Sequence, residues 1–126
     1  MDIVKNNFFQ KRNPQIINFM RSWDPWEVLD FHQLLGNKTT PLIHLTHLAK
    51  KLGIKSIIVK DESQRLGLNS FKALGASYVM AKQLENNPDI ETFCTATDGN
   101  HGRSVAWMAR KLNRKSIVYV PRNTSI

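Results

Sequence analysis

Lys72 stands where a predicted helix begins, in the stretch LGLNSFKALGASYVM that covers residues 66–80. Ser70 is placed to cap this helix, and the partial positive charge at a helix start disfavours a protonated amine. A neutral amine is a nucleophile that forms Schiff bases with carbonyl compounds. Gly75 and Ala76 follow one turn later and leave room for a flat ring or for close backbone packing. The motif alone also fits an ordinary solvated lysine.

A second polar loop, Asp98-Gly99-Asn100-His101-Gly102, lies between a predicted strand and a predicted helix. Its two glycines permit a close backbone approach or a positive φ angle. The carboxylate of Asp98 is a candidate proton acceptor. The simpler alternative is a tight turn in which Asn100 caps the helix.

Hydrophobic periodicity predicts the elements that position these two loops. Short β-branched runs predict strands at 55–60, 92–96 and 116–120, and apolar spacing predicts helices at 70–86 and 101–113. Strands that alternate with helices over short connections predict an α/β fold, with a parallel sheet and flanking helices. Both polar loops then follow the carboxyl ends of strands, which is where ligands bind in open α/β sheets.

The first part of the chain predicts shorter elements. DPWEVLDFHQLL is predicted to be a helix that Asp24 caps and Gly36 ends, TPLIHL to be extended, and THLAKKLG to be a brief helix from Thr46 to Gly53. We therefore divide the chain into residues 1–54, an N-terminal extension with the first elements, and residues 55–126, a βαβαβ unit that carries both loops.

Apolar spacing also predicts which side chains are buried. The expected apolar faces of the two longer helices are Phe71, Leu74, Tyr78 and Ala81 on the first and Val105, Met108, Ala109 and Leu112 on the second. The single cysteine, Cys94, excludes an internal disulfide, and its apolar surroundings predict a buried packing residue.

Composition narrows the possible partners of the 126-residue chain, which carries a formal net charge of +8. Its cations are scattered in short pairs at predicted helix ends, which favours solvated faces over binding to nucleic acid or membrane. His44 and His47 have no carboxylate or cysteine at ligand spacing, so no metal site is predicted. The absence of a long apolar run and of a secretory signal predicts a cytoplasmic protein.

Together, NSFKALGASY and TDGNHGRSVAW resemble the lysine motif and the asparagine loop of the tryptophan-synthase-like (fold type II) pyridoxal-phosphate enzymes. The resemblance implies that Lys72 binds pyridoxal 5'-phosphate covalently and that Asn100 lies beside the cofactor's 3-hydroxyl. It implies further cofactor-binding roles for Ser70, Gly99 and His101.

Within this superfamily, KDESQRLGLNSFKALGASY and ATDGNHGRSVAWMARKL most resemble the diaminopropionate ammonia-lyases. The resemblance implies a lyase that converts 2,3-diaminopropionate to pyruvate and ammonia. Lys72 and Asp98 are then the candidate catalytic bases on opposite faces of the substrate, which matches the use of both enantiomers in that family. Threonine and serine dehydratases usually have Thr-Gly or a similar pair where this chain has Leu68-Asn69, and a small neutral residue in place of Asp98.

The resemblance also shows which motifs this sequence lacks. Enzymes of this type bind the cofactor phosphate through a glycine-rich loop and the pyridine nitrogen through a hydroxyl residue, both further along the chain. The six glycines here form no such run. We therefore expect the polypeptide to be the N-terminal third of such an enzyme, too short for activity alone, from a homodimeric parent. A serine or threonine dehydratase-like lyase and a non-catalytic α/β fragment are the alternatives.

Overall fold

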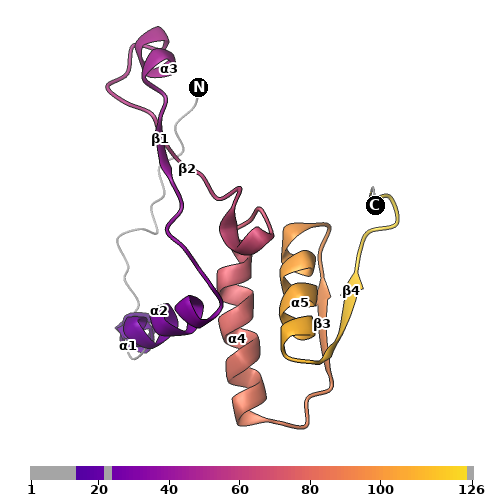
Figure 1. The fold of residues 1–126 in the computed structure, drawn as a ribbon. Coiled ribbons are helices and arrows are strands. Elements are labelled where there is room, and N and C mark those ends of the chain that lie inside the picture. The colour runs from indigo at the N-terminus through magenta and orange to yellow at the C-terminus, as the bar shows by residue number, and fades with distance from the viewer. Residues whose placement is uncertain (1–13, 22–23, 125–126) are drawn as a thin grey trace.

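The computed structural model describes residues 14–21 and 24–124. Its elements in chain order are α1 (Pro14–Arg21), α2 (Pro25–Leu34), β1 (Leu42–His44), α3 (Thr46–Lys51), β2 (Ile58–Lys60), the 3₁₀ turn η1 (Arg65–Gly67), α4 (Lys72–Asn86), β3 (Thr92–Ala96), α5 (Asn100–Lys111) and β4 (Lys115–Tyr119). Figure 1 shows a body built from α4, α5, β3 and β4, and a slender arm of β1, α3 and β2 that projects away from it.

The body is a two-stranded parallel sheet with helices on one face. β3 and β4 pair in register from Thr92 opposite Lys115 to Ala96 opposite Tyr119. Helices α4 and α5 pack against each other, and α5 also packs against both strands. The buried core between them consists of Met80, Ala81, Phe93, Val105, Met108 and Ala109. This arrangement confirms the predicted α/β class, a parallel sheet with flanking helices.

The prediction that three strands form one parallel sheet is wrong. β2 pairs antiparallel with β1, in a separate sheet that joins residues on both sides of the boundary expected between 54 and 55. A β-branched run predicts a strand but does not encode its partner, and β1 is close in the chain, so that pairing closes a short loop at small entropic cost. The expected βαβαβ unit is therefore only β3–α5–β4, preceded by α4.

Helix α2 begins and ends as its sequence predicts. The Asp24 carboxylate accepts a hydrogen bond from the backbone N–H of Trp26 at 2.9 Å, and Gly36, with φ of 79°, follows the last turn. The buried ring of His32 donates from Nε2 to the carbonyl oxygen of Leu74 at 2.8 Å. This contact ties α2 to the first turns of α4.

Burial on the two long helices follows the predicted spacing on α5 better than on α4. Val105, Met108 and Ala109 are buried as expected. On α4, the prediction for Phe71 is wrong, since its ring is 62% exposed. Ala81 is buried as expected, and the buried face of α4 also carries Ala73, Ser77 and Met80, whose small members let α5 approach closely.

The prediction for Cys94 is also wrong, because its side chain is exposed. Successive residues of a strand point to opposite faces, and in β3 it is Phe93 that faces the helices. Cys94 lies with Ile117, its register partner on β4, on the face of the sheet that no described helix covers.

Among the described residues, no helix is both long enough and apolar enough to span a bilayer.

Candidate functional site

Lys72 is the first residue of α4, and its side chain is exposed. The hydroxyl oxygen of Ser70 accepts a hydrogen bond from the backbone N–H of Lys72 at 3.2 Å. Ser70 is itself buried, so this bond satisfies a helix-start donor and a buried hydroxyl together. Phe71 occupies the N-cap position of α4, and the expected bond from a helix-start N–H to Ser70 is present and fixes the backbone from which the Lys72 amine projects.

The second loop is tighter than the first. The Thr97 hydroxyl accepts from the backbone N–H of Gly99 at 3.3 Å, and Asn100 is already the first residue of α5. The alternative in which Asn100 precedes and caps the helix is therefore wrong. The Asn100 side chain is exposed at the helix start, as is that of Asp98 just before it.

The two loop glycines behave differently. A Cβ added at Gly102 would lie 2.7 Å from Val118 Cγ1 and 2.8 Å from Thr97 Cγ2, which real Cβ atoms do not tolerate. Gly102 therefore lets the first turn of α5 approach the ends of β3 and β4, as the sequence predicts. Gly99 has an extended φ of −176° and open space around it, so neither expected reason for a glycine applies there.

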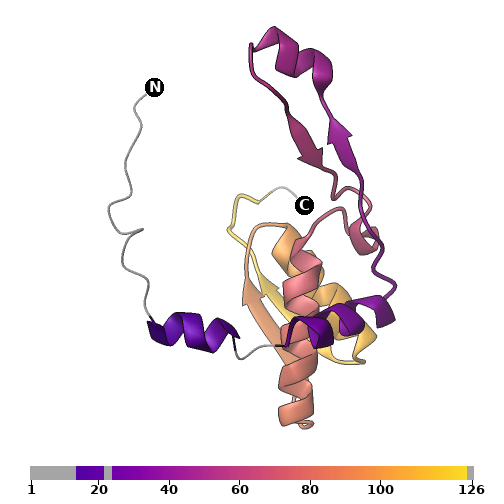
Figure 2. The same cartoon turned by 90° about the vertical axis from the view of Figure 1, so that its left-hand side faces the viewer.

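The structure brings both predicted loops to the same end of the molecule. α4 and α5 lie side by side, and Figures 1 and 2 show that both helices begin at the end where β3 finishes. Lys72 and Asn100, each the first residue of its helix, share this end, and the loop with Asp98 joins β3 to α5. Helix starts carry backbone N–H groups without helical partners and favour anionic ligands.

Two hollows lie near these loops. One of about 300 Å³ is lined by residues of α4, β3 and α5 that include Gly75, Ala76 and His101. A Cβ added at Gly75 would meet nothing within 4 Å, so this face of α4 has the room that its sequence predicts. The other hollow, of about 520 Å³, is lined by the loop residues Asp98, Gly99 and Gly102 together with the end of β4.

Sequence reasoning missed Arg65, a buried cation seven positions before Lys72. Its Nε donates to Glu62 Oε2 at 2.6 Å and its Nη2 to Glu62 Oε1 at 2.8 Å. Hydrogen bonds from Arg65 and from the Thr40 hydroxyl lower the pKa of Glu62 to about 2. The only signal in the sequence is an acid and a base at i,i+3 spacing in DESQR, which is also common on solvated surfaces.

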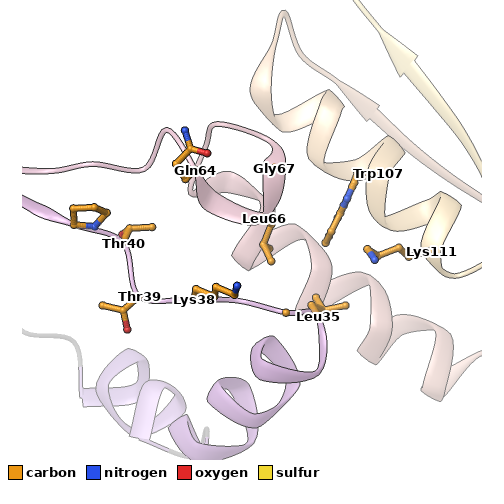
Figure 3. A pocket seen from close by; sticks show the side chains of 11 residues that line it. Leu35, Lys38, Thr39, Thr40, Gln64, Leu66, Gly67, Trp107 and Lys111 are labelled. Carbon is orange, nitrogen blue, oxygen red and sulfur yellow. The ribbon is translucent and has the colours of Figure 1, made fainter.

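A further cavity of about 540 Å³ lies between η1, the segment after α2 and the last turns of α5 (Figure 3). Gln64, Leu66 and Gly67, which lie in the segment just before Lys72, form one wall of this cavity. The Lys111 ammonium lies 5.0 Å from the centroid of the Trp107 ring on another side. None of the predicted site residues lines this cavity, so it is separate from the helix-start site.

Comparison with known proteins places this chain in a family. The family described as "Pyridoxal-phosphate dependent enzyme" matches residues 34–126. The diaminopropionate ammonia-lyase of Salmonella typhimurium is 46% identical over 122 residues, which cover 79% of this chain and 30% of that protein. The diaminopropionate ammonia-lyase of Escherichia coli K12 is 38% identical over an alignment of 143 residues, and the alignment covers 99% of this chain and 35% of that protein.

Solved structures give the same result. The crystal structure of the E. coli diaminopropionate ammonia-lyase in complex with an aminoacrylate-PLP azomethine reaction intermediate superposes with a TM-score of 0.80 at 37% identity, and covers 98% of this chain and 34% of that one. The chain thus spans about a third of the length of the relatives it matches. By the extent of the family match and the shared fold, the chain belongs to the pyridoxal-phosphate-dependent enzymes of fold type II.

Proposed function

We propose that this chain supplies the lysine and asparagine loops of a diaminopropionate ammonia-lyase, which converts 2,3-diaminopropionate to pyruvate and ammonia. The observation that carries the proposal is the placement of Lys72 and Asn100 at adjacent helix starts at one end of the molecule. The likeness to diaminopropionate ammonia-lyases over nearly the whole chain supports the choice of substrate.

The residues of this chain fit one side of pyridoxal 5'-phosphate. The exposed amine of Lys72 suits its aldehyde, and the exposed carboxamide of Asn100 suits the neighbouring ring hydroxyl. Gly75 leaves open space one turn along α4. The phosphate would be held by residues outside this sequence, since its glycines form no phosphate-binding run. When bound, the cofactor supplies an electron sink for the pair left on the substrate α-carbon.

The chain's own residues would then hold and move protons. Lys72 accepts the α-proton from one face of the substrate, and Asp98 accepts it from the other face. Asn100 orients the cofactor ring, and Ser70 keeps the start of α4 fixed through its bond to the Lys72 N–H. Gly99 and His101 flank Asn100, and His101 also lines the hollow beside Gly75. Loss of the β-amino group then follows from the carbanion character at the α-carbon.

A dehydratase acting on serine or threonine would use the same cofactor with a hydroxyl leaving group. Asp98 is the feature that favours the ammonia-lyase, because a second base on the opposite face suits a substrate taken in both configurations. We further propose that the complete enzyme is a homodimer that acts in the cytoplasm on a small amino acid. Exposed apolar side chains on the arm, such as Leu42 at 61% and Ile58 at 51%, support an interface with another polypeptide.

Substrate turnover by a completed enzyme tests this proposal. Residues 1–126 would be joined to the matching C-terminal portion of the E. coli relative, with the intact relative as the positive control. We expect pyruvate release from diaminopropionate to exceed oxoacid release from serine and threonine by orders of magnitude in kcat/KM. Faster turnover of serine or threonine would favour the dehydratase, and a folded, cofactor-free protein would favour a non-catalytic fragment.

A further inference from the structure

A single buried guanidinium connects the loop before α4 to the segment that leads into β1. We call residues 61–71 the lysine loop. Arg65 donates from Nε to Glu62 Oε2 at 2.6 Å, from Nη2 to Glu62 Oε1 at 2.8 Å and to Thr40 Oγ1 at 2.9 Å, and from Nη1 to the Lys38 carbonyl oxygen at 2.8 Å and to Asn37 Oδ1. An arginine has five N–H groups, and all of them have acceptors here.

The partners of Arg65 are also bonded to one another. The Thr40 hydroxyl donates to Glu62 Oε1 at 2.6 Å, and the Lys60 amine donates to the Thr40 carbonyl oxygen. The Arg65 side chain is 9% exposed and that of Glu62 is 19% exposed, so water screens the pair only weakly. The low pKa of Glu62, caused first by its hydrogen bonds from Arg65, keeps the carboxylate charged and the network closed near neutral pH.

The lysine loop needs such a restraint because its backbone is strained. Leu66 has a φ of 49° and Asn69 a φ of 57°, both in the left-handed region that non-glycine residues adopt at a cost in energy. Leu66 follows Arg65 directly, and Asn69 precedes Ser70, whose hydroxyl accepts the hydrogen bond from the Lys72 N–H. Conformations of this kind persist where the surrounding structure holds them. The loop therefore sets where α4 begins and where the Lys72 amine projects.

We propose that Arg65 is a positioning residue for Lys72, holding the lysine loop against residues 37–40 so that Lys72 is presented at the start of α4. The inference rests on the proposed role of Lys72 as the cofactor lysine. It differs from a purely structural role, in which loss of Arg65 would loosen the whole body rather than this loop.

The test compares Arg65→Met with Arg110→Met in the 126-residue chain. Arg110 is exposed in the last turn of α5 and is remote in sequence from the lysine loop, so it serves as the matched control. Hydrogen exchange followed by mass spectrometry would measure amides 61–72 and, for comparison, amides 103–111. We expect Arg65→Met to speed exchange at 61–72 by tenfold or more and to leave 103–111 unchanged. Exchange that is unchanged at 61–72, or equally faster in both segments, would overturn the proposal.

A second readout follows the reactivity of Lys72 itself. Each protein would be mixed with pyridoxal phosphate and reduced with borohydride, and peptide mapping would compare labelling of Lys72 with that of Lys51, an exposed lysine on the arm. We expect the Lys72 to Lys51 ratio to fall severalfold in Arg65→Met and to stay constant in Arg110→Met. An unchanged ratio in a variant with normal circular dichroism would contradict a positioning role.

Two gentler variants keep the test decisive if Arg65→Met does not fold. Glu62→Gln keeps the side-chain size but removes the charge, and Thr40→Val removes the bridging hydroxyl. Wild-type exchange at 61–72 in both of these variants would overturn the proposal. The exchange measurement contains no cofactor, so it tests the restraint of the loop independently of the reactivity of Lys72. An unreactive Lys72 in the wild-type chain would count against the proposed function and not against the restraint by Arg65.

Discussion

Lys72 and Asn100 are the first residues of two helices that lie side by side and begin at the same end of the molecule (Figure 2). The parallel pairing of β3 and β4 produces this relationship. Both strands run toward that end of the molecule, and the helix before each of them, α4 before β3 and α5 before β4, starts at the same end. An amine and a carboxamide are therefore presented at two neighbouring helix starts. This arrangement suits a ligand that carries an aldehyde next to a ring hydroxyl.

The 126-residue chain alone is expected not to release pyruvate from diaminopropionate. The cofactor phosphate carries about two negative charges, and without a nest of backbone amides its binding would depend on a reversible covalent bond and a few side chains. A coupled pyruvate assay on the purified chain checks this prediction. Release of pyruvate by a preparation that mass spectrometry shows to be free of a full-length host enzyme would contradict it.

Asp98→Asn in the completed enzyme should separate the two enantiomers. Asparagine keeps the size and much of the turn chemistry of aspartate but does not accept the α-proton, so folding and cofactor binding should persist. We expect turnover of D-diaminopropionate to fall by orders of magnitude, while the L-isomer, deprotonated from the Lys72 side, loses much less. Equal losses for both isomers would give Asp98 a general electrostatic role, and no loss would leave it as a turn residue.

Gly102→Ala and Gly75→Ala form a matched pair of stability tests. A methyl group at Gly102 would collide with Val118 and Thr97, and such overpacking costs about 1–3 kcal/mol in the free energy of unfolding. At Gly75 the same methyl group meets nothing within 4 Å in the interior of α4, where alanine is favoured over glycine by about 0.5–1 kcal/mol. Urea unfolding of the 126-residue chain should show opposite signs. Equal effects at both positions would refute the close approach of α5 to the strands.

The elements around the site were predictable where their signals are local. The strand at 92–96, the bond from the Lys72 N–H to Ser70 and the start of the α2 helix at Asp24 all follow from side chains within a few positions of each other. The position of both polar loops after strands also follows from this local pattern. Sequence reasoning therefore predicted the presence and order of these elements best, whereas several of their ends differ by one to three residues, as for β2, predicted at 55–60 and found at Ile58–Lys60.

The features that were missed depend on contacts between distant residues. β2 pairs with β1, a pairing that the sequence of β2 alone does not encode. Which side of β3 is buried depends on where α4 and α5 pack, and Cys94 lies on the opposite, exposed side. From the sequence alone, Arg65 is expected to be a surface cation, and it is buried only because the fold places residues 37–40 against it. No periodicity in the sequence reports such a contact.

Acid should weaken the chain partly through Glu62. Its pKa in the folded state is about 2, below the ordinary value of 4.5, so its contribution to stability is present above about pH 4.5 and is lost as the pH falls toward 2. Glu62→Gln should lower the free energy of unfolding at neutral pH by roughly 1–3 kcal/mol. The difference between the wild type and the variant should shrink across that window in urea titrations. A difference that stays constant down to about pH 3 would contradict the network.

The identity of the lysine that carries the cofactor is the most direct test of the account. Lys82, the other lysine of α4, is paired with Glu27 and Glu85, and these bonds raise its pKa and keep it protonated, whereas Lys72 is exposed at the helix start. The completed enzyme would be loaded with pyridoxal phosphate, reduced with borohydride and mapped by mass spectrometry, beside Lys72→Ala and the control Lys51→Ala. We predict that the label lies on Lys72, disappears in Lys72→Ala with loss of the yellow absorbance, and persists in Lys51→Ala. A borohydride-sensitive yellow species that survives in Lys72→Ala, with the label on another lysine, would contradict the proposed cofactor site.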